Sequence, residues 1–319
     1  MKKFLLTGAF MIGAFSLVSV SEAYAYDLYV DKDSSSSTED GTQGNPYKTI
    51  SAAVLKAESN LSGQRSIYIS NGTYTESFEI NEEMSLTGES KNLTIINGHG
   101  KSKTVDIEAT STISNLTIME GYVGIYVNAG AGATIKKCKI LKTEKMGVEI
   151  ESSSTSDSEK VTISGSDISK GEGKGFYIKK RRILIEDNDI EDNEEEGIDI
   201  RSGVKGKIKK NTIAKNGESG IELIVGKSDL KITGNKIKSN SASGIANQFY
   251  KDSKKLGEVL IEKNKISKND SYGVRCSAPS GGNVPKNYWI KSIDLVRNIF
   301  SGNDNIFAKR CDFSIALKK

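Results

Sequence analysis

A short pattern that recurs about every 23 residues constrains the fold of this chain more than any other feature of its sequence. The pattern is a glycine followed by an apolar residue, any residue and a second apolar residue. It begins at Gly124, Gly147, Gly175, Gly197 and Gly220, with weaker copies at Gly244 and Gly273. A repeat of this length favours one elongated domain in which each copy stacks on the next.

Asparagines recur in phase with the glycines. One column lies in the pattern apolar-x-x-Asn-x-apolar and consists of Asn188, Asn211, Asn235, Asn264 and Asn298. A second column lies five residues later and consists of Asn193, Asn216, Asn240, Asn269 and Asn303. Asparagine tolerates unusual backbone angles at a tight bend and can form hydrogen bonds to the neighbouring bend. We therefore predict that the asparagines of the first column, which begins at Asn188, stack as a ladder. Their side chains would form hydrogen bonds with the backbone groups of buried turns.

The apolar residues within each repeat alternate at period two, in short runs separated by polar turns, and a helical repeat would show period 3.6 instead. Three such runs fit into a copy of the repeat. This is the pattern of one coil of a parallel β-helix, in which each strand pairs with its copy in the next coil at about 4.8 Å. The fold class is therefore all-β, as a single-domain solenoid. Cys138 occupies the asparagine register in an earlier coil, where we expect a small buried residue ahead of the ladder.

Two stretches near the start of the chain resemble a known group. The sequence DLYVDKDSSSSTEDGTQGNPYKTISAAVLKA, residues 27 to 57, followed by SIYISNGTYTE, residues 66 to 76, looks like the entry to right-handed parallel β-helix proteins of the pectate-lyase-like superfamily. The later coils resemble the repeat of those proteins over nearly all of the remaining chain. The resemblance implies the fold but no single function, because this fold hosts lyases, hydrolases, epimerases and non-catalytic surface proteins.

The first 25 residues predict a secretory signal peptide. Lys2 and Lys3 precede an apolar stretch, residues 4 to 20, and Ala23-Tyr24-Ala25 provides a small-x-small cleavage site. We expect a secreted protein without a membrane-inserted segment, because the apolar stretch is too short for a stable anchor. We divide the remaining chain into an N-terminal strand, linker and helical cap over residues 26 to 66 and the β-helix over residues 67 to 319.

A short amphipathic helix is predicted within TQGNPYKTISAAVLKA, residues 42 to 57, because Ile50, Ala53, Val54 and Ala57 share one face. The first coil of a β-helix exposes an apolar core and unpaired strand edges, and a helix at this position would cover them.

Composition limits the function classes. The formal net charge is +4, and loss of residues 1–25, which hold two lysines and one glutamate, leaves +3. Because the basic residues are interspersed with acidic ones, we do not expect nucleic-acid binding. One histidine and five methionines do not suit a Ser-His-Asp hydrolase or a protein that loads soft metals. Three cysteines are an odd number for an exported chain, and Cys276 and Cys311 could pair.

The most acidic stretch, IEDNDIEDNEEEGIDI, covers residues 185 to 200. It lacks the ligand spacing and the glycine of an EF-hand calcium loop. The period-two pattern places the four isoleucines inward and Asn188 in the ladder. We interpret the other acidic residues up to Glu196 as a solvated face or loop.

The resemblance implies that functional groups project from the strands that begin with the marker glycine. Alternation along these strands predicts one outward row, which consists of Asp106, Tyr126, Glu149, Tyr177, Asp199, Glu222, Ala246 and Arg275. From this row we select Glu149, Asp199 and Glu222 as candidate ligands of Ca²⁺, which prefers oxygen donors. Such an ion would neutralise the carboxylate of a uronate sugar and acidify its C5 proton.

The same face offers a base and substrate contacts for β-elimination. Lys179 or Arg201 would remove or steer the proton, with Lys179 the better base because arginine stays protonated. Arg275 would hold a second carboxylate. Tyr126 and Tyr177 would offer flat faces to sugar rings, with Asn128 as a further substrate contact. These residues predict a polysaccharide lyase that acts as a monomer on an acidic polysaccharide.

Several alternatives remain open. The same charged residues could simply stabilise cross-strand packing, and a rigid β-helix can bind glycans or serve as an adhesin without any chemistry. The sequence Gly98-His99-Gly100 is similar to a motif of polygalacturonases, but its partner motifs are absent, so His99 is interpreted as a turn residue. The last of three long turns, residues 277 to 291, could form a wall beside the outward row or cover the end of the core.

Overall fold

The computed structural model describes residues 26–60, 65–154, 156, 159–250, 256–279, 281, 283–307 and 311. Within these residues the chain forms three parallel sheets and two short helices, α1 (Ile50–Glu58) and α2 (Tyr288–Ser292). The predicted signal peptide, residues 1–25, lies outside the described residues. Neither helix in the described part of the chain has the length and hydropathy that a membrane-spanning segment needs.

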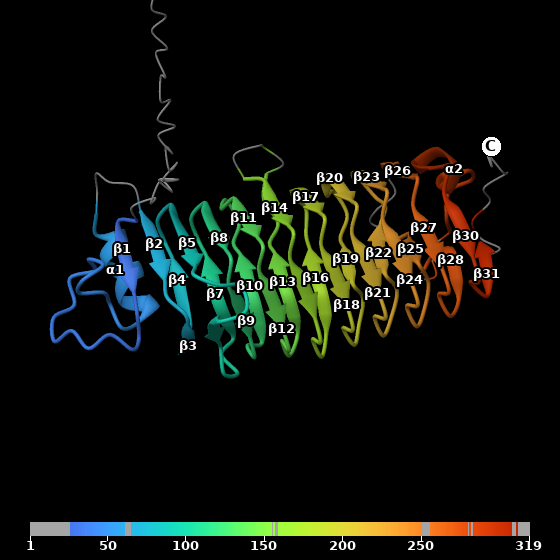
Figure 1. The fold of residues 1–319 in the computed structure, drawn as a ribbon. Helices are drawn as coiled ribbons and strands as arrows, with labels where there is room; N and C mark the ends of the chain where they lie inside the picture. Colours follow the sequence, from blue (N-terminus) through green and yellow to red (C-terminus); the bar gives the residue numbers. More distant parts are fainter. Residues whose placement is uncertain are drawn as a thin grey trace, which may run out of the picture.

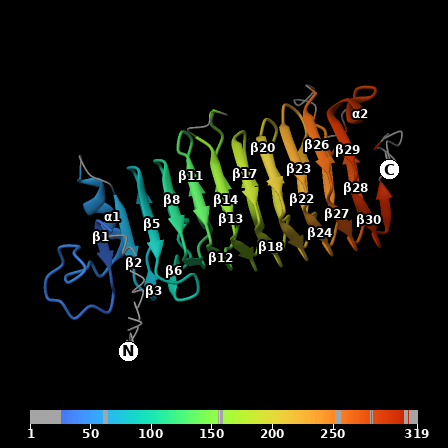
Figure 2. The same ribbon diagram turned by 45° about the horizontal axis from the view of Figure 1, so that its top comes forward.

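Successive strands along the chain pass from sheet A to sheet B to sheet C and back, so the chain winds as a right-handed solenoid of stacked coils (Figures 1 and 2). Sheet A contains β1 (Leu28–Val30), β2 (Ser66–Ile69), β5 (Met84–Gly88), β8 (Ser111–Ser114), β11 (Ala133–Lys136), β14 (Val161–Ser164), β17 (Arg182–Glu186), β20 (Lys205–Lys209), β23 (Asp229–Thr233), β26 (Glu258–Glu262) and β29 (Ile293–Val296).

Sheet B contains β3 (Gly72–Thr75), β6 (Thr94–Asn97), β9 (Thr117–Met119), β12 (Lys139–Leu141), β15 (Asp167–Ser169), β18 (Asp189–Glu191), β21 (Thr212–Ala214), β24 (Lys236–Lys238), β27 (Lys265–Ser267) and β30 (Ile299–Ser301). Sheet C contains β4 (Phe78–Ile80), β7 (Lys103–Ile107), β10 (Val123–Val127), β13 (Met146–Ile150), β16 (Lys174–Ile178), β19 (Ile198–Ile200), β22 (Ile221–Ile224), β25 (Ile245–Gln248), β28 (Tyr272–Ser277) and β31 (Asn305–Phe307). The predicted all-β solenoid is confirmed.

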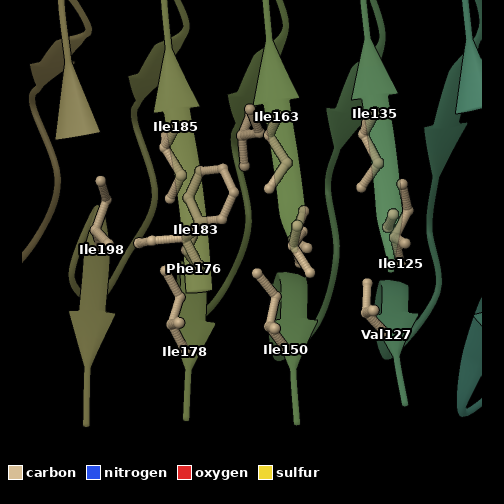
Figure 3. Close-up of a cluster of buried hydrophobic side chains, with 14 of the residues drawn as sticks. Ile125, Val127, Ile135, Ile150, Ile163, Phe176, Ile178, Ile183, Ile185 and Ile198 are labelled. Atoms are coloured by element: carbon tan, nitrogen blue, oxygen red, sulfur yellow. The ribbon is translucent and has the colours of Figure 1, made fainter. Parts of the chain in front are cut away.

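The core consists of stacked aliphatic side chains from all three sheets. Ile163 and Ile185 of sheet A and Ile150 and Ile178 of sheet C belong to one core cluster in the interior (Figure 3). All four are fully buried. Burial of one such side chain contributes about 2 kcal/mol, so the repeated columns stabilise every coil in the same way.

The marker glycines lie where the chain turns from sheet B into sheet C. A Cβ atom on Gly147 would lie 2.6 Å from the carbonyl oxygen of Gly175 in the next coil and 2.7 Å from Cγ2 of Ile168. The backbone and the core isoleucine therefore occupy the space that any side chain would need, which explains why glycine recurs at this point.

The predicted asparagine ladder is present. Oδ1 of Asn211 accepts hydrogen bonds from the backbone N–H and from Nδ2 of Asn188, both at 3.0 Å. Nδ2 of Asn211 in turn donates to Ile185 O and to Oδ1 of Asn235. The ladder continues to Asn298, and the second asparagine column forms an equivalent ladder that ends at Asn303.

Serine and cysteine precede the first ladder. The Ser166 hydroxyl accepts a hydrogen bond from the Cys138 N–H, and the Ser166 N–H donates to Asn188 Oδ1. Cys138 is a free, buried thiol, as predicted. His99 lies in a turn with a positive φ of 44°, which agrees with its interpretation as a turn residue.

Helix α1 caps the N-terminal end. It begins after Thr49, whose side chain accepts a hydrogen bond from the Ala52 N–H. Its buried face consists of Ile50, Ala53, Val54 and Ala57, as the apolar pattern predicted. The helix packs against β1, β2 and β4. It is shorter than the quoted stretch because residues 42 to 49 are not helical and include Tyr47, which forms a parallel β-bridge with Val30.

The C-terminal end is closed differently. Cys276 and Cys311 form a disulfide across 35 residues of sequence, which settles the open question of their pairing. Helix α2 buries Tyr288 and Trp289, and the Tyr288 ring packs edge-on against Phe249. The helix lies against β26 and β29 of sheet A, and its Tyr288 and Trp289 belong to the core, so this end of the long turn covers the core.

Candidate functional site

The predicted outward row exists and lies on the outer face of sheet C. Strand pairing places its residues side by side on consecutive strands: Asp106, Tyr126, Glu149, Tyr177, Asp199, Glu222, Ala246 and Arg275. Neighbouring members are separated by one strand spacing, about 4.8 Å. The row therefore brings aromatic, acidic and basic groups from eight coils onto one surface.

Five residues near the middle of this row form what we call the central cluster: Lys174, Tyr177, Asp199, Arg201 and Glu222. The Asp199 side chain is fully buried although it points away from the core. Its Oδ2 lies 3.0 Å from Nη2 of Arg201 and 3.3 Å from Nζ of Lys174. The Arg201 guanidinium also lies over the Tyr177 ring, 5.1 Å from its centroid.

One oxygen of Asp199 is left without a partner. Its Oδ1 is buried and has no hydrogen-bond partner among the described residues, and the same is true of Arg201 Nε. Burial raises the pKa of Asp199, while Arg201 and Lys174 oppose that effect. A buried carboxylate held by two cations is a rigid charged element that can orient Arg201 toward the surface.

Glu196 corrects one prediction. We expected the acidic run up to Glu196 to be solvated, and Asp187, Asp192 and Glu194 are indeed exposed. Glu196, however, is only 3% exposed, because it pairs with the Lys174 ammonium of the preceding coil. Both residues directly precede a marker glycine, so the repeat itself aligns them.

Glu196 also shares a proton-binding site with Glu218. Their carboxyl groups are hydrogen-bonded, and two carboxylates this close cannot both remain ionised. Burial works to raise the pKa of Glu196, but the hydrogen bond with Glu218 and the Lys174 ammonium outweigh it and hold this pKa below its usual range. The hydrogen bond to Glu196 together with burial raises the pKa of Glu218 to about 7. Glu218 is therefore the member of the pair that gains or loses a proton near neutrality.

Glu222 is the half-buried carboxyl of the central cluster. Burial, reinforced by the carboxylates of Glu196 and Asp199, raises its pKa to about 7. A carboxyl group with such a pKa can both accept and donate a proton near neutrality, which is what general acid–base chemistry requires.

Glutamine at position 222 should make folding less sensitive to pH. The Glu222 pKa is raised from 4.5 to about 7, so its contribution to stability is present below 4.5 and is lost as pH rises through about 7. We expect Glu222→Gln to gain unfolding free energy relative to the wild type between about pH 5 and about pH 8. Urea unfolding at several pH values measures this. Glu79→Gln, which changes an exposed carboxyl of the same sheet face, is the control, and an equal gain in both variants would contradict the prediction.

Lys179 is engaged in ion pairs. Its Nζ contacts Glu151 and lies 3.3 Å from Oε1 of Glu149. Partial burial works to lower the pKa of Lys179, but the two carboxylates outweigh it and the pKa is raised above its ordinary value. A more tightly held proton disfavours Lys179 as a base, so Glu222 is the better candidate for that role.

Toward the N-terminus the row contains Tyr126, and Asn128 lies two residues later, directly after β10. Lys103 lies over the Tyr126 ring, 3.6 Å from its centroid, and Asn128 donates a hydrogen bond to Glu108. The fully buried Arg181, which we did not select from the sequence, donates to the carbonyl oxygens of Asn128 and Glu151. This arginine fixes the corner from which both residues project.

The three candidate calcium ligands do not form one site. Glu149 and Asp199 lie on strands separated by β16, and each is paired with a cation, Lys179 and Arg201 respectively. No group of three or more His, Cys, Asp or Glu suited to a metal ion occurs within the described ranges. Arg275 is exposed and is separated from Glu222 by Ala246, so it lies at the edge of the central cluster.

The comparisons with known proteins agree with this architecture. The family described as "Right handed beta helix region" matches residues 104–254. The chain therefore has the right-handed β-helix fold that the resemblance implied. A comparison with curated protein sequences finds no match.

Several solved structures share the β-helix. Pectate lyase Pel9A is 16% identical, with a TM-score of 0.60 over 89% of this chain and 78% of that chain. An alginate lyase from Paenibacillus sp. is 14% identical, with a TM-score of 0.60 over 81% and 95%. The A-module of mannuronan C-5 epimerase AlgE6 from Azotobacter vinelandii is 16% identical, with a TM-score of 0.52 over 81% and 90%. Identities this low establish the shared β-helix fold alone.

Proposed function

We propose that this protein cleaves an acidic, uronate-containing polysaccharide by β-elimination on the outer face of sheet C. The observation that carries the proposal is the register of Tyr177, Asp199 and Glu222 on β16, β19 and β22, with Arg201 beside them. An aromatic face, a fixed cation and a titrating carboxyl thus lie within two strand spacings. The solved structures named for action on pectate, alginate and mannuronan support the class of substrate.

Three members of the central cluster have direct roles in the proposed reaction. The Tyr177 ring supports a sugar ring, and Arg201 faces the uronate carboxylate and stabilises the charge that develops there. The Glu222 carboxylate removes the C5 proton. The electron pair of that C–H bond forms the C4–C5 double bond while the C4–O4 bond breaks, and the leaving oxygen takes a proton from water.

The remaining selected residues extend the site. Tyr126 and Asn128 would bind sugar units further along the row, and Arg275 would hold a carboxylate at the other edge. Ca²⁺ remains a prediction, and because its three candidate ligands do not meet, no step of the mechanism uses it. We also propose that the protein is exported and acts as a monomer.

A non-catalytic glycan-binding role is the second candidate. It is favoured by the ion pairs of Lys179 and Arg201, which engage both cations near Tyr177 before any substrate binds. A binding protein needs only the aromatic faces and hydrogen-bond donors of the row.

An assay for unsaturated uronate ends separates the two functions. The purified protein without residues 1–25 would be incubated with pectate, alginate, hyaluronan and chondroitin, each with Ca²⁺ and with chelator, while ultraviolet absorbance is followed. We expect absorbance to rise with at least one polymer, because elimination leaves a conjugated double bond. Polymer binding without new ends would instead support the non-catalytic role. Equal rates with Ca²⁺ and with chelator would contradict a calcium requirement.

A further inference from the structure

A groove on a different face of the β-helix is not used by the proposed reaction. It lies on the outer side of sheet A, has a volume of about 600 Å³ and extends from β17 to α2. Five basic side chains line it, Arg182, Lys205, Lys207, Lys231 and Lys291, together with three acidic ones, Asp229, Glu258 and Asp294. We call this surface the basic groove.

The basic groove places like charges side by side. Lys205 is in register with Arg182 on the neighbouring strand, and Lys207 is in register with Lys231. Like charges directly opposite each other on a sheet destabilise it. Other register pairs are favourable, since Lys205 is also in register with Asp229, and Nζ of Lys209 lies 2.5 Å from Oε2 of Glu186.

Three of the groove lysines have no ion-pair partner within the described ranges: Lys205, Lys207 and Lys291. Lys231 is paired, since its Nζ lies 2.7 Å from Oε1 of Glu262. The groove therefore differs from the sheet C face, where Lys174, Lys179 and Arg201 are all held by carboxylates. The ammonium groups of these three lysines would be stabilised by a bound anion.

A second observation also points to a ligand. Ser292, at the end of α2, lines the groove and is 2% exposed. Its hydroxyl has no hydrogen-bond partner in the described part of the structure. Buried hydroxyl groups are almost always hydrogen-bonded, so this one is suited to a ligand or a bound water at the α2 wall.

The shape and the mixed charge of the groove indicate the class of ligand. The groove spans five strands of sheet A, about 19 Å at the usual strand spacing, which suits an extended chain better than a single anion. Asp229, Glu258 and Asp294 would repel a polymer with densely spaced phosphates. They can, however, accept hydrogen bonds from sugar hydroxyl groups while the lysines bind sparser carboxylates or sulfates.

We propose that the basic groove is a second binding site, which holds an acidic polysaccharide away from the outer face of sheet C. The inference rests on the proposed function in one respect, because the class of polymer is taken from it. Held there, the polymer would stay at the protein surface while another part of it reaches the central cluster, which raises its effective concentration.

The test compares two double charge reversals in a Glu222→Gln background, in which cleavage is expected to be too slow to disturb a binding measurement. Lys205→Glu with Lys207→Glu alters the groove. Lys236→Glu with Lys238→Glu alters two exposed lysines of β24, with the same spacing and the same change in net charge. Binding of polygalacturonate and alginate oligosaccharides is measured by calorimetry, with dextran as a neutral glycan, and circular dichroism checks the fold.

We expect the groove variant to bind acidic oligosaccharides at least about tenfold more weakly, and the β24 variant to bind them within about twofold of the parent. Equal losses in both variants would show a net-charge effect and overturn the inference. No loss in the groove variant, with binding abolished by Tyr177→Ala, would overturn it in favour of sheet C alone. Both results are binding measurements and do not depend on cleavage. A failure of the proposed lyase activity would appear instead in the absorbance assay of the wild type.

Discussion

Glu222→Gln is expected to lower the rate of polymer cleavage by about 10²- to 10⁴-fold, because glutamine has the shape of glutamate but cannot take up a proton. The wild-type rate should rise as pH increases through about 7, since burial and two neighbouring carboxylates set the Glu222 pKa there and only the ionised form acts as a base. Initial rates over a pH series, as kcat/KM, measure both effects.

The direction of the pH dependence is the decisive outcome. A rate that falls as pH rises through about 7 would mean that the protonated carboxyl acts as an acid, which suits hydrolysis and contradicts β-elimination. Glu79→Gln, in an exposed carboxyl of the same sheet face, is the control and should retain the wild-type rate. A Glu222→Gln enzyme with unchanged rate would remove Glu222 from the mechanism altogether.

Asn211→Ala is expected to destabilise the fold by roughly 3 kcal/mol, because it leaves several buried polar groups without partners. The backbone N–H of Asn188 would lose its acceptor, and the carbonyl oxygen of Ile185 would lose a donor. Each such loss costs about 1–3 kcal/mol when water cannot reach the group. Urea unfolding of wild type and variant, followed by circular dichroism, gives the difference.

Asn298→Ala is the matched control. Asn298 accepts the same pair of hydrogen bonds from Asn264 at the last step of the ladder, but it is half-buried, so water can replace the lost partner. We expect less than half of the effect seen at Asn211. Equal destabilisation at both positions would mean that burial of the ladder does not set its energy.

The outward row illustrates what a repeat allows. The spacing of the marker glycines predicts that Tyr177, Asp199 and Glu222 are neighbours on consecutive strands. The strand register confirms this alignment. Alignment was possible because period-two alternation assigns a face and the repeat assigns a neighbour. The repeat does not show which side chains interact. We expected Glu149 and Asp199 to share a cation, but each pairs with a basic side chain instead.

Glu196 and Lys174 illustrate the opposite case. Local composition, with three successive glutamates, indicated a solvated surface, but Glu196 is buried beside Lys174. Their shared position before the marker glycine was visible in the sequence. What could not be read there was that a lysine 22 residues away would cover the carboxylate and exclude water from it.

The coil, the direction in which each strand residue points and the asparagine ladders can be predicted from the sequence, because they depend on short-range backbone geometry that every repeat restates. The folded chain was needed to find which charges pair, that Asp199 is buried, that the pKa of Glu222 is raised and that sheet A carries a basic groove. These properties depend on long side chains that reach between coils and on loops and helices that exclude water. The free energy of a charge changes with its neighbours in space, which a local pattern does not specify.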